Sequence, residues 1–270
     1  MKLTNLKKLR PKFGFLVIVI LYLPCQAFAW GLIGHRVIGE IASFHLTAKA
    51  RKEIQKILGN ESIAMASTWA DFYKSDPAYD YLYNWHFINI NDTLNHDQFI
   101  NKLKNDTAVD AYTKVNRLVD SLKMKSLPAD KKLLYLRLLI HFIGDLHQPM
   151  HVARQSDLGG NRVRVQWFNQ PSNLHKVWDE QLVEFQQLSY TEYARVLNYT
   201  TKLQRQALQK QPIAEWIFDT YQQCQKVYAG IKEDNQKLSY RYNYDYVGML
   251  NDQLLKGGIR LAGILNELFA

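Results

Sequence analysis

The sequence predicts an all-α fold, namely a single, mostly helical domain with a small β-hairpin insertion. Apolar residues recur at helical spacing through most of the chain, as in the stripe between Leu250 and Leu268. No linker, low-complexity tract or repeat divides the sequence, and 270 residues suffice to bury one core. One short segment, residues 161–168, alternates in the manner of a strand instead.

The expected helices are marked by their apolar spacing and by their ends. Thr47 is placed to cap the first of them and Gly59 to close it. Pro128 is placed to start a long apolar helix that runs through Leu133 to Ile143. In order, the expected helices cover residues 48–58, 62–73, 97–104, 107–123, the helix from 128, 191–208, 212–231 and 245–269. Residues 161–168 followed by the turn-like Asn169-Gln170-Pro171-Ser172 predict the hairpin.

The first 29 residues have the three parts of a secretory signal peptide. Basic residues come first, an apolar run covers 13–23, and Ala27-Phe28-Ala29 supplies a small-x-small cleavage site. The run is roughly half of the ~20 residues that span a bilayer, so a cleaved leader is favoured over an anchor. We therefore expect a signal peptide over 1–29 and one domain over 30–270, exported to the periplasm or secreted and without a membrane span.

Cleavage after Ala29 would give Trp30 a free α-amino group. Such an amine has a pKa of about 8 and is partly neutral at physiological pH, so it can bind a metal. His35 follows closely, which makes Trp30 and His35 candidate ligands of one ion.

Composition excludes a strongly basic footprint of the kind that binds nucleic acid by charge alone. The leader carries five of the 34 Lys and Arg residues and none of the 25 Asp and Glu residues. The remainder has a net charge of +4, from 29 basic and 25 acidic residues, which is compatible with an anionic substrate. Cys25 lies in the leader and Cys224 is the other cysteine, so the mature chain has no intramolecular disulfide.

Histidine and aspartate residues recur at the spacing of metal ligands. His141 and Asp145 are four residues apart, as are His175 and Asp179, and residues at i and i+4 share one face of a helix. Further candidate ligands are Asp71, His86 and His151. A lone histidine is more often a satisfied core residue, and a His/Asp pair can be a surface pair, but the conjunction favours a metal site. Imidazoles and carboxylates without cysteine suit zinc, with manganese or iron left open.

The motifs around these residues carry a resemblance to a known family. They are Trp30-Gly-x-x-Gly-His35, Ser67-Thr-Trp-Ala-Asp71, Trp85-His86-Phe-Ile-Asn, His141-Phe-Ile-Gly-Asp145-Leu-His-Gln-Pro-Met-His151, Gly159-Gly-Asn161, Asn173-Leu-His175-Lys-Val-Trp-Asp179, and Gly258-Ile-Arg-Leu-Ala-Gly-Ile-Leu-Asn. In this order they resemble the zinc-dependent single-strand nucleases of the mung-bean-nuclease type.

The resemblance implies three zinc ions per chain. One would take Asp71, His86, His141 and Asp145; a second the Trp30 amino nitrogen and carbonyl oxygen, His35 and Asp145; the third His151, His175 and Asp179. Asp145 would then bridge two ions. His45, His96 and His147 remain outside the implied ligand set.

The resemblance also implies an activity and its substrates. The enzyme would cleave single-stranded DNA and RNA to 5′-phosphorylated products and remove the 3′-phosphate of nucleotides, with Asp71 and Asp145 at the catalytic metals. Lys74 stands where the family usually has an arginine, and could supply a charge to the phosphate. Asn161 is a candidate phosphate or base ligand and Phe87 a candidate base platform. Lesser candidates for base stacking are Tyr79, Tyr81, Tyr83, Trp167 and Phe168.

Two alternative functions stay open at this point. Zinc-dependent phospholipase C shares the fold, the N-terminal tryptophan and the three-zinc arrangement, but the Ser-Thr-Trp-Ala-Asp71 and Gly159-Gly-Asn161 stretches favour the nuclease. A non-catalytic periplasmic zinc carrier would not need Asn161 or Phe87 near the metals. No stable protein partner is expected.

Overall fold

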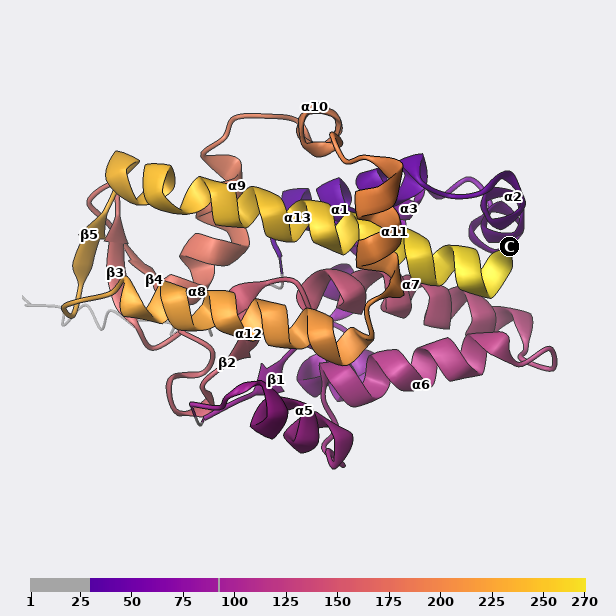
Figure 1. The fold of residues 1–270 in the computed structure, drawn as a ribbon, viewed down its shortest axis with the longest axis horizontal. Helices are drawn as coiled ribbons and strands as arrows, with labels where there is room; N and C mark the ends of the chain where they lie inside the picture. The colour runs from indigo at the N-terminus through magenta and orange to yellow at the C-terminus, as the bar shows by residue number, and fades with distance from the viewer. Residues whose placement is uncertain (1–29, 92) are drawn as a thin grey trace, which may run out of the picture.

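A computed structural model describes residues 30–91 and 93–270 (Figure 1). The expected signal peptide, residues 1–29, lies outside the described residues. The α-helices are α1 Leu32–Phe44, α2 Ala48–Leu58, α3 Ile63–Ala66, α4 Trp69–Tyr73, α5 His96–Lys104, α6 Ala111–Lys123, α7 Ala129–Asp145, α8 Leu174–Lys176, α9 Leu182–Glu184, α10 Tyr190–Leu197, α11 Lys202–Lys210, α12 Ile213–Ala229 and α13 Tyr240–Phe269. The expected mostly helical single domain is confirmed.

The centre of the fold is the second half of α7. Every residue from Leu138 to Asp145 is buried, so this helix has no solvent-facing side there. Burial of a large apolar side chain such as Phe142 contributes about 1.5–3 kcal/mol, and this term holds the helix in the interior. The polar side chains that α7 carries near its end are therefore fixed inside the protein.

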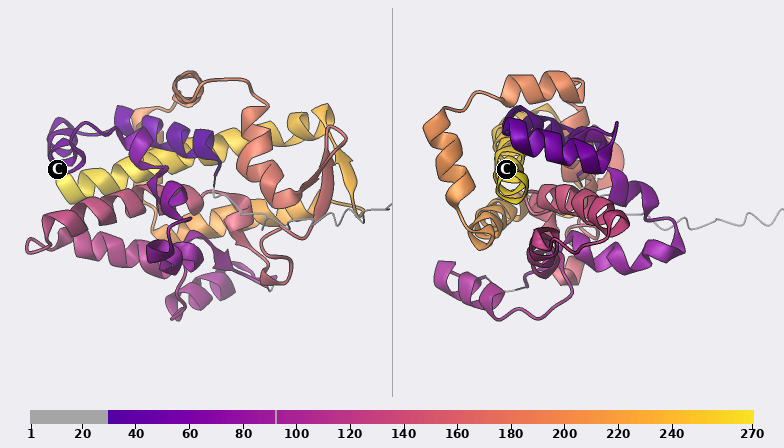
Figure 2. Two further views of the ribbon diagram at one scale, coloured as in Figure 1. Left: turned by 180° about the vertical axis from the view of Figure 1, so that it is seen from behind. Right: turned by 90° about the vertical axis from the view of Figure 1, so that its right-hand side faces the viewer.

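Helix α13 runs along the length of the molecule and packs against α1, α7 and α11 (Figures 1 and 2). Its closest approach to α1 depends on Gly258, because a Cβ atom there would lie 2.5 Å from Cβ of Ile41. The contact places α1, and with it the start of the described chain, beside the end of α7.

The strands form two small sheets beside the helices. β1 Ile88–Asn89 pairs in parallel with β2 Val152–Ala153, and the second sheet has the order β4-β3-β5, with β3 Arg164–Trp167, β4 Gln170–Asn173 and β5 Gln236–Leu238. The expected hairpin is β3 and β4, but its turn lies at Phe168–Asn169 rather than at 169–172. Both turn residues have positive φ, as a two-residue hairpin loop requires, and Pro171 lies on the edge strand, where its missing N–H costs no ladder bond.

Several helix boundaries differ from the expected ones for local reasons. Helix 62–73 is broken at Ser67–Thr68, and helix 191–208 is broken before Thr201, whose side chain caps α11. Helix 107–123 begins later because Asp110 caps α6. Helix α13 begins at Tyr240 rather than at 245.

Helix α1 and the 3₁₀ helix η1 Pro77–His86 were not among the expected elements. Two further short 3₁₀ helices are η2 Pro149–His151 and η3 Gln155–Asp157. Within the described ranges, no helix is long and apolar enough to cross a membrane.

Candidate active site

The last turn of α7 presents two of the predicted ligands. His141 and Asp145 lie one helical turn apart, and Nε2 of His141 is 3.3 Å from Oδ2 of Asp145. Both side chains are fully buried. Their positions follow from the apolar residues that surround them on the same helix.

The second His/Asp pair lies on a helix with a local change of pitch. Residues Val177–Gln181 form a π-helical segment, η4, between α8 and α9, and such segments often occur at functional sites. Nε2 of His175 lies 2.9 Å from Oδ2 of Asp179, and the buried Gln148 donates a hydrogen bond to Oδ1 of Asp179. Gln148 was not among the predicted site residues.

The other predicted ligands reach Asp145 and its neighbours from four separate elements. His35 comes from α1, and its Nε2 lies 3.3 Å from Oδ1 of Asp145 and 4.0 Å from Oδ2 of Asp71, on α4. His86 lies at the end of η1, and its Nδ1 is 3.0 Å from Oδ2 of Asp145. His151, in η2, joins the two halves of the site, with Nδ1 3.6 Å from Oδ1 of Asp145.

Backbone carbonyl groups fix the orientation of three imidazoles. Each of His141, His151 and His175 places Nδ1 2.7 Å from a carbonyl oxygen, that of Ser67, His86 and Gly159 respectively. A ring that donates from Nδ1 keeps Nε2 as the lone-pair nitrogen, the arrangement found in metal-binding histidines. The break between α3 and α4 leaves the Ser67 carbonyl available for this contact.

Many polar atoms of this cluster are buried without a hydrogen-bond partner among the described residues. They are both ring nitrogens of His35, both carboxylate oxygens of Asp71, Oδ1 of Asp145, Nε2 of His151 and of His175, and Oδ2 of Asp179. An unsatisfied buried polar group costs about 1–3 kcal/mol, and more if it is charged. Bound cations would satisfy the carboxylate oxygens and one ring nitrogen of each of these histidines, so the residues present fit a metal centre.

Burial and the neighbouring charges shift the pKa values of the cluster residues. Burial opposes the charged form of Asp145, yet neighbouring histidines hold its pKa well below the usual range. Burial is likewise outweighed at Asp179, whose pKa neighbouring histidines lower to about 2. Burial lowers the pKa of His35 and of His86. At His141 and His151 burial is instead outweighed by neighbouring carboxylates, which raise the pKa of His141 and raise that of His151 to about 9. These two imidazoles would therefore release a proton on binding a metal, whereas the carboxylates and the other two imidazoles already favour the form that binds one.

Within the described part of the chain, three groups of side chains are close enough to hold an ion each. In each group the potential ligand atoms lie within 4.8 Å of one another: His35, Asp71 and His141; His86, His141 and Asp145; His151, His175 and Asp179. The third group is the expected third set. The first two groups share His141. Together they contain every side chain expected to bind the first and second ions, but they distribute these side chains differently between the two positions.

Trp30 lies beside these groups. Trp30 is fully buried. The backbone N–H of the next residue, Gly31, donates a 2.6 Å hydrogen bond to the backbone carbonyl of Asp179. The start of the domain is thus tied to the backbone of a predicted ligand, and coordination by Trp30 stays a prediction.

Lys74, Asn161 and Phe87 each lie close to a residue of the cluster in space or along the chain. Lys74 closes α4, and its Nζ lies 3.5 Å from Oδ1 of Asp71. Asn161 lies two residues after Gly159, whose carbonyl accepts a hydrogen bond from His175. The side-chain amide of Asn161 donates a hydrogen bond to the carbonyl of Leu158. Phe87 is half-buried next to His86.

The lesser candidates for base stacking differ in exposure. Tyr81 and Tyr83 are 50% and 69% exposed. Trp167 is buried and packs against Phe185 and Tyr242, so the expectation that it stacks on a base is wrong. Phe168 likewise stacks on Phe185 inside the sheet region.

Gly144 is a site residue that sequence reasoning missed. A Cβ atom at this position would lie 2.7 Å from Nδ1 of His35, whose ring stacks on that of His141 with centroids 4.0 Å apart. The only available signal was a glycine inside an otherwise apolar helix, where it costs about 1 kcal/mol relative to alanine.

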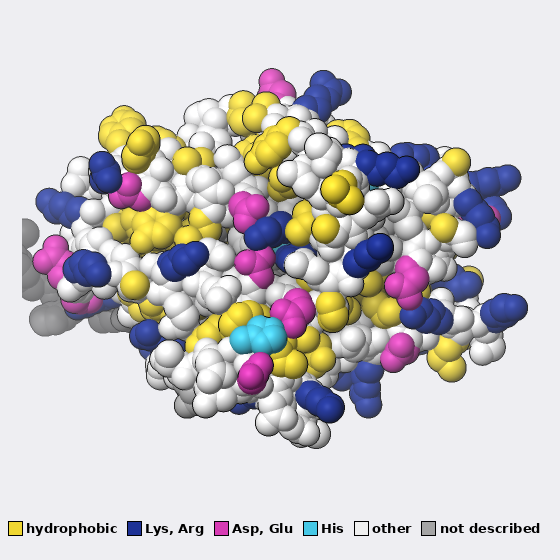
Figure 3. Space-filling view, in the orientation of Figure 1, with side chains coloured by type: hydrophobic (Ala, Val, Ile, Leu, Met, Phe, Trp, Pro, Cys, Tyr) yellow, Lys and Arg dark blue, Asp and Glu magenta, His cyan; other side chains and the backbone are white. Residues whose placement is uncertain are grey.

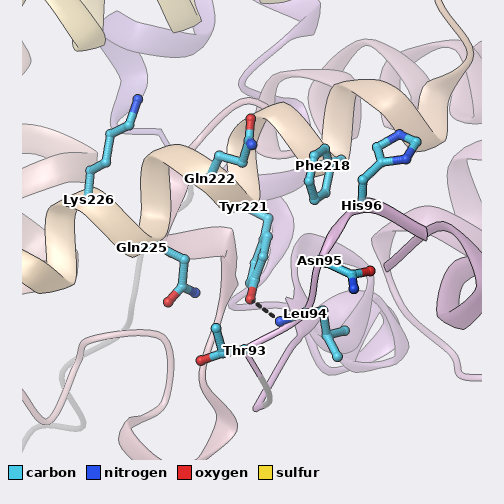
Figure 4. A pocket seen from close by; sticks show the side chains of 9 residues that line it. All are labelled: Thr93, Leu94, Asn95, His96, Phe218, Tyr221, Gln222, Gln225 and Lys226. Atoms are coloured by element: carbon cyan, nitrogen blue, oxygen red, sulfur yellow. Dashed lines mark hydrogen bonds between the residues drawn. The ribbon is translucent and has the colours of Figure 1, made fainter. Parts of the chain in front are cut away.

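Other features of the surface do not converge on this cluster. A hollow between the start of α5 and α12 contains none of the cluster residues, and in it the Leu94 amide donates to the Tyr221 hydroxyl (Figure 4). On the face drawn in Figure 3, basic and acidic side chains are interspersed and form no basic stripe.

Comparison with known proteins agrees with the motifs in the cluster. The profile of the S1/P1 nuclease family matches residues 30–270. The chain is 27% identical to Endonuclease 2 of Arabidopsis thaliana, over 99% of this chain and 100% of that protein. It is 29% identical to Endonuclease 3 of Arabidopsis thaliana, over 94% of each chain. It is 30% identical to Nuclease P1 of Penicillium citrinum, over 56% of this chain and 57% of that protein. The chain therefore belongs to the S1/P1 nuclease family, and it is a hydrolytic nuclease whose buried histidines and aspartates could bind metal.

Proposed function

We propose that this nuclease uses three zinc ions to hydrolyse phosphodiester bonds in single-stranded DNA and RNA. The products would carry 5′-phosphates, and nucleotides would lose a 3′-phosphate. The observation that carries the proposal is the set of three adjacent His/Asp groups with buried, unsatisfied ligand atoms. Nitrogen and oxygen donors without cysteine favour zinc over softer or harder ions.

Each metal position would draw on side chains from separate elements. Asp71, His86, His141 and Asp145 would hold the first ion, and His35, Asp145 and the amino and carbonyl groups of Trp30 the second. His151, His175 and Asp179 would hold the third. Zinc bound there would supply an acidified water molecule and would offset the negative charge of the phosphodiester.

The side chains at the rim would bind and orient the substrate. Lys74 is close enough to the Asp71 carboxylate to place its ammonium group beside a phosphate held at that ion. A lysine supplies the charge of an arginine without its two parallel hydrogen bonds. Asn161 would bind phosphate or base through its amide, and Phe87 would stack on the base of the nucleotide at the cluster.

The buried position of the cluster supports a preference for single strands. Asp145 and His141 are fully buried, so a stacked and paired backbone could not bring its phosphate to them. A single strand can bend and can turn a base onto an aromatic ring.

We also infer that residues 1–29 are a cleaved signal peptide and that residues 30–270 form the exported enzyme. The expected cleavage site directly precedes Trp30, which is buried beside Asp179. Export and assembly of the second metal position would then be coupled through the new amino group.

One experiment tests the proposal. The mature protein, beginning at Trp30, would be analysed for bound metals and assayed on single-stranded DNA, single-stranded RNA, the matching duplex, 3′-nucleotides and phosphatidylcholine vesicles. We expect three zinc ions per chain, cleavage of both single strands, and slower cleavage of the duplex. Lipid cleavage without nucleic-acid cleavage would establish the phospholipase alternative, and zinc binding without turnover on any substrate would establish the carrier.

A further inference from the structure

A strip of aromatic side chains covers the surface next to the metal cluster. We define the aromatic strip as Trp69, Phe72, Tyr73, Tyr79, Tyr81 and Trp85. Phe72 is 77% exposed, Tyr81 is 50% exposed and Tyr73 is also exposed, whereas the other three rings are half-buried and pack against the core. Exposed aromatic side chains that adjoin one another are uncommon on a soluble protein and mark interaction sites.

The rings of the strip form a continuous series of contacts. Phe72 and Tyr73 have centroids 5.2 Å apart, and Tyr73 and Tyr79 5.6 Å. The series continues from Tyr79 to Tyr81 at 6.3 Å and from Tyr81 to Trp85 at 5.4 Å. The strip therefore acts as one extended surface rather than as scattered single rings.

Both ends of the strip are next to predicted metal ligands along the chain, Asp71 at one end and His86 at the other. Its first part belongs to α4, the helix that also carries Asp71 and is closed by Lys74. Its last ring, Trp85, packs against Phe142 with centroids 6.0 Å apart, and Phe142 packs against His86 at 5.0 Å.

Cations flank the strip on its inner side. Nζ of Lys114 lies 4.6 Å from the ring centre of Trp85, and the guanidinium of Arg137 lies 5.5 Å from that of Trp69. Asp76 and Asp80 are exposed on the same segment, and their charge opposes phosphate binding there. The faces of bases, rather than phosphates, are what this surface fits.

We propose that the aromatic strip binds the bases of a single-stranded polynucleotide that extends beyond the nucleotide held at the metal cluster. This inference rests on the proposed function and specifies its substrate as a strand longer than the cleaved linkage. Aromatic rings stack on any base, so the strip would raise affinity without selecting sequence. A duplex keeps its bases stacked on one another and would gain nothing from the strip.

The test compares short and long substrates in matched variants. Phe72→Ala and Tyr81→Ala, alone and combined, would be compared with Tyr199→Ala, which removes a 71% exposed tyrosine from the connection between α10 and α11. The substrates are a dinucleotide and a 12-nucleotide single strand that contains the same scissile linkage. A phosphorothioate strand of that length, which resists cleavage, would measure binding by fluorescence anisotropy.

The combined variant should lower kcat/KM on the long strand by roughly 5- to 100-fold, because one stacked base contributes about that factor. It should weaken binding of the phosphorothioate strand by a similar factor, and it should change dinucleotide cleavage by less than about twofold. Tyr199→Ala should resemble the wild type on every substrate. Equal loss on both substrates, or no loss on either, would overturn the inference.

Two other results separate this inference from the proposed function. Absence of cleavage of both substrates by the wild type would reject the proposed function itself. Self-association of the wild type that Phe72→Ala abolishes, with unchanged cleavage of the long strand, would assign the strip to contact between two copies of the chain and overturn the inference.

Discussion

Oδ2 of Asp145 lies 3.0 Å from Nδ1 of His86, a residue 59 positions earlier in the chain. The other oxygen of the same carboxylate lies 3.3 Å from Nε2 of His35. One buried carboxylate thus joins side chains from α1, η1 and α7, and it is the residue on which the rest of the site depends.

Replacement of Asp145 by Asn should remove more than one metal ion per chain. An amide keeps the volume but loses the charge that two neighbouring ions would share, so several kcal/mol of stabilisation are lost. We expect cleavage of single-stranded RNA to fall by about 10³-fold or more. Metal analysis of the purified variant measures the first effect. The control is Asp234→Asn, which removes an exposed carboxylate paired with Arg164 and should keep all its metal and activity. An Asp145→Asn protein with full metal content would show that Asp145 does not bridge two ions.

An extra residue before Trp30 should inactivate the mature enzyme. The extension converts the α-amino group of Trp30 into an amide, which has no lone pair to offer a metal. The added residue must also be accommodated next to Trp30, which is fully buried. The extended and the correctly processed proteins would be compared for zinc content and for kcat/KM on single-stranded DNA. Equal activity of the two proteins would exclude Trp30 as a ligand.

Lys74→Ala should lower kcat by about 10- to 100-fold, because a hydrogen bond from a charged donor contributes about 1.5–3 kcal/mol. Lys74→Arg should recover most of the loss, since it restores the charge and adds a second parallel hydrogen bond. Metal content should not change in either variant. Lys226→Ala, on exposed α12 surface, serves as the control. If Lys74→Ala cleaves as fast as the wild type, Lys74 has no role in the reaction.

Gly144→Ala, in the last turn of α7, and Gly248→Ala, in α13, form a pair of helical substitutions. A Cβ atom at Gly248 meets nothing within 4 Å, so Ala there should raise the free energy of unfolding by about 0.5–1 kcal/mol. A Cβ atom at Gly144 would lie 2.7 Å from the His35 ring and must displace it. We expect Gly144→Ala to lose metal affinity by at least about tenfold. Urea unfolding and zinc titration of both variants measure these effects, and similar behaviour of the two would reject the steric argument.

Stability should depend on pH through Asp110, the N-terminal cap of α6. Burial raises the pKa of Asp110 to about 7, whereas an unfolded aspartate has a pKa of about 3.9. Between these values the folded protein binds the extra proton, so the free energy of unfolding falls as the pH rises from about 4 to about 7.

Asp110→Asn should remove this dependence, because an amide oxygen can still accept from the Thr113 amide while it carries no charge. Relative to the wild type, the variant should gain roughly 1–4 kcal/mol between pH 5 and pH 8. Asp110→Ala should instead lose about 1 kcal/mol of capping energy. Urea unfolding of the three proteins at both pH values tests the sign. The prediction is contradicted if the wild type becomes more stable relative to Asp110→Asn as the pH rises.

The sequence by itself determined the features that depend on neighbours along the chain. Thr47 and Gly59 bound α2 as expected, because capping bonds form between residues a few positions apart. The His141/Asp145 and His175/Asp179 pairs were visible for the same reason, since i and i+4 meet on any helix. The family resemblance then covered residues 30–270 because its motifs are local strings.

Only the tertiary structure decided how these local pieces combine. The hydrogen bond from His141 to the Ser67 carbonyl joins residues 74 positions apart, so no local stretch of sequence contains it. The π-helical segment that carries Asp179 was likewise not visible in the sequence. The hairpin turn lies at Phe168–Asn169 rather than at 169–172 because β3 is also paired with the distant β5. His35 meets Asp145 across 110 positions because α1 packs closely on Gly258 and passes over Gly144. Such contacts arise from the burial of apolar faces in three dimensions, so a sequence read one window at a time does not contain them.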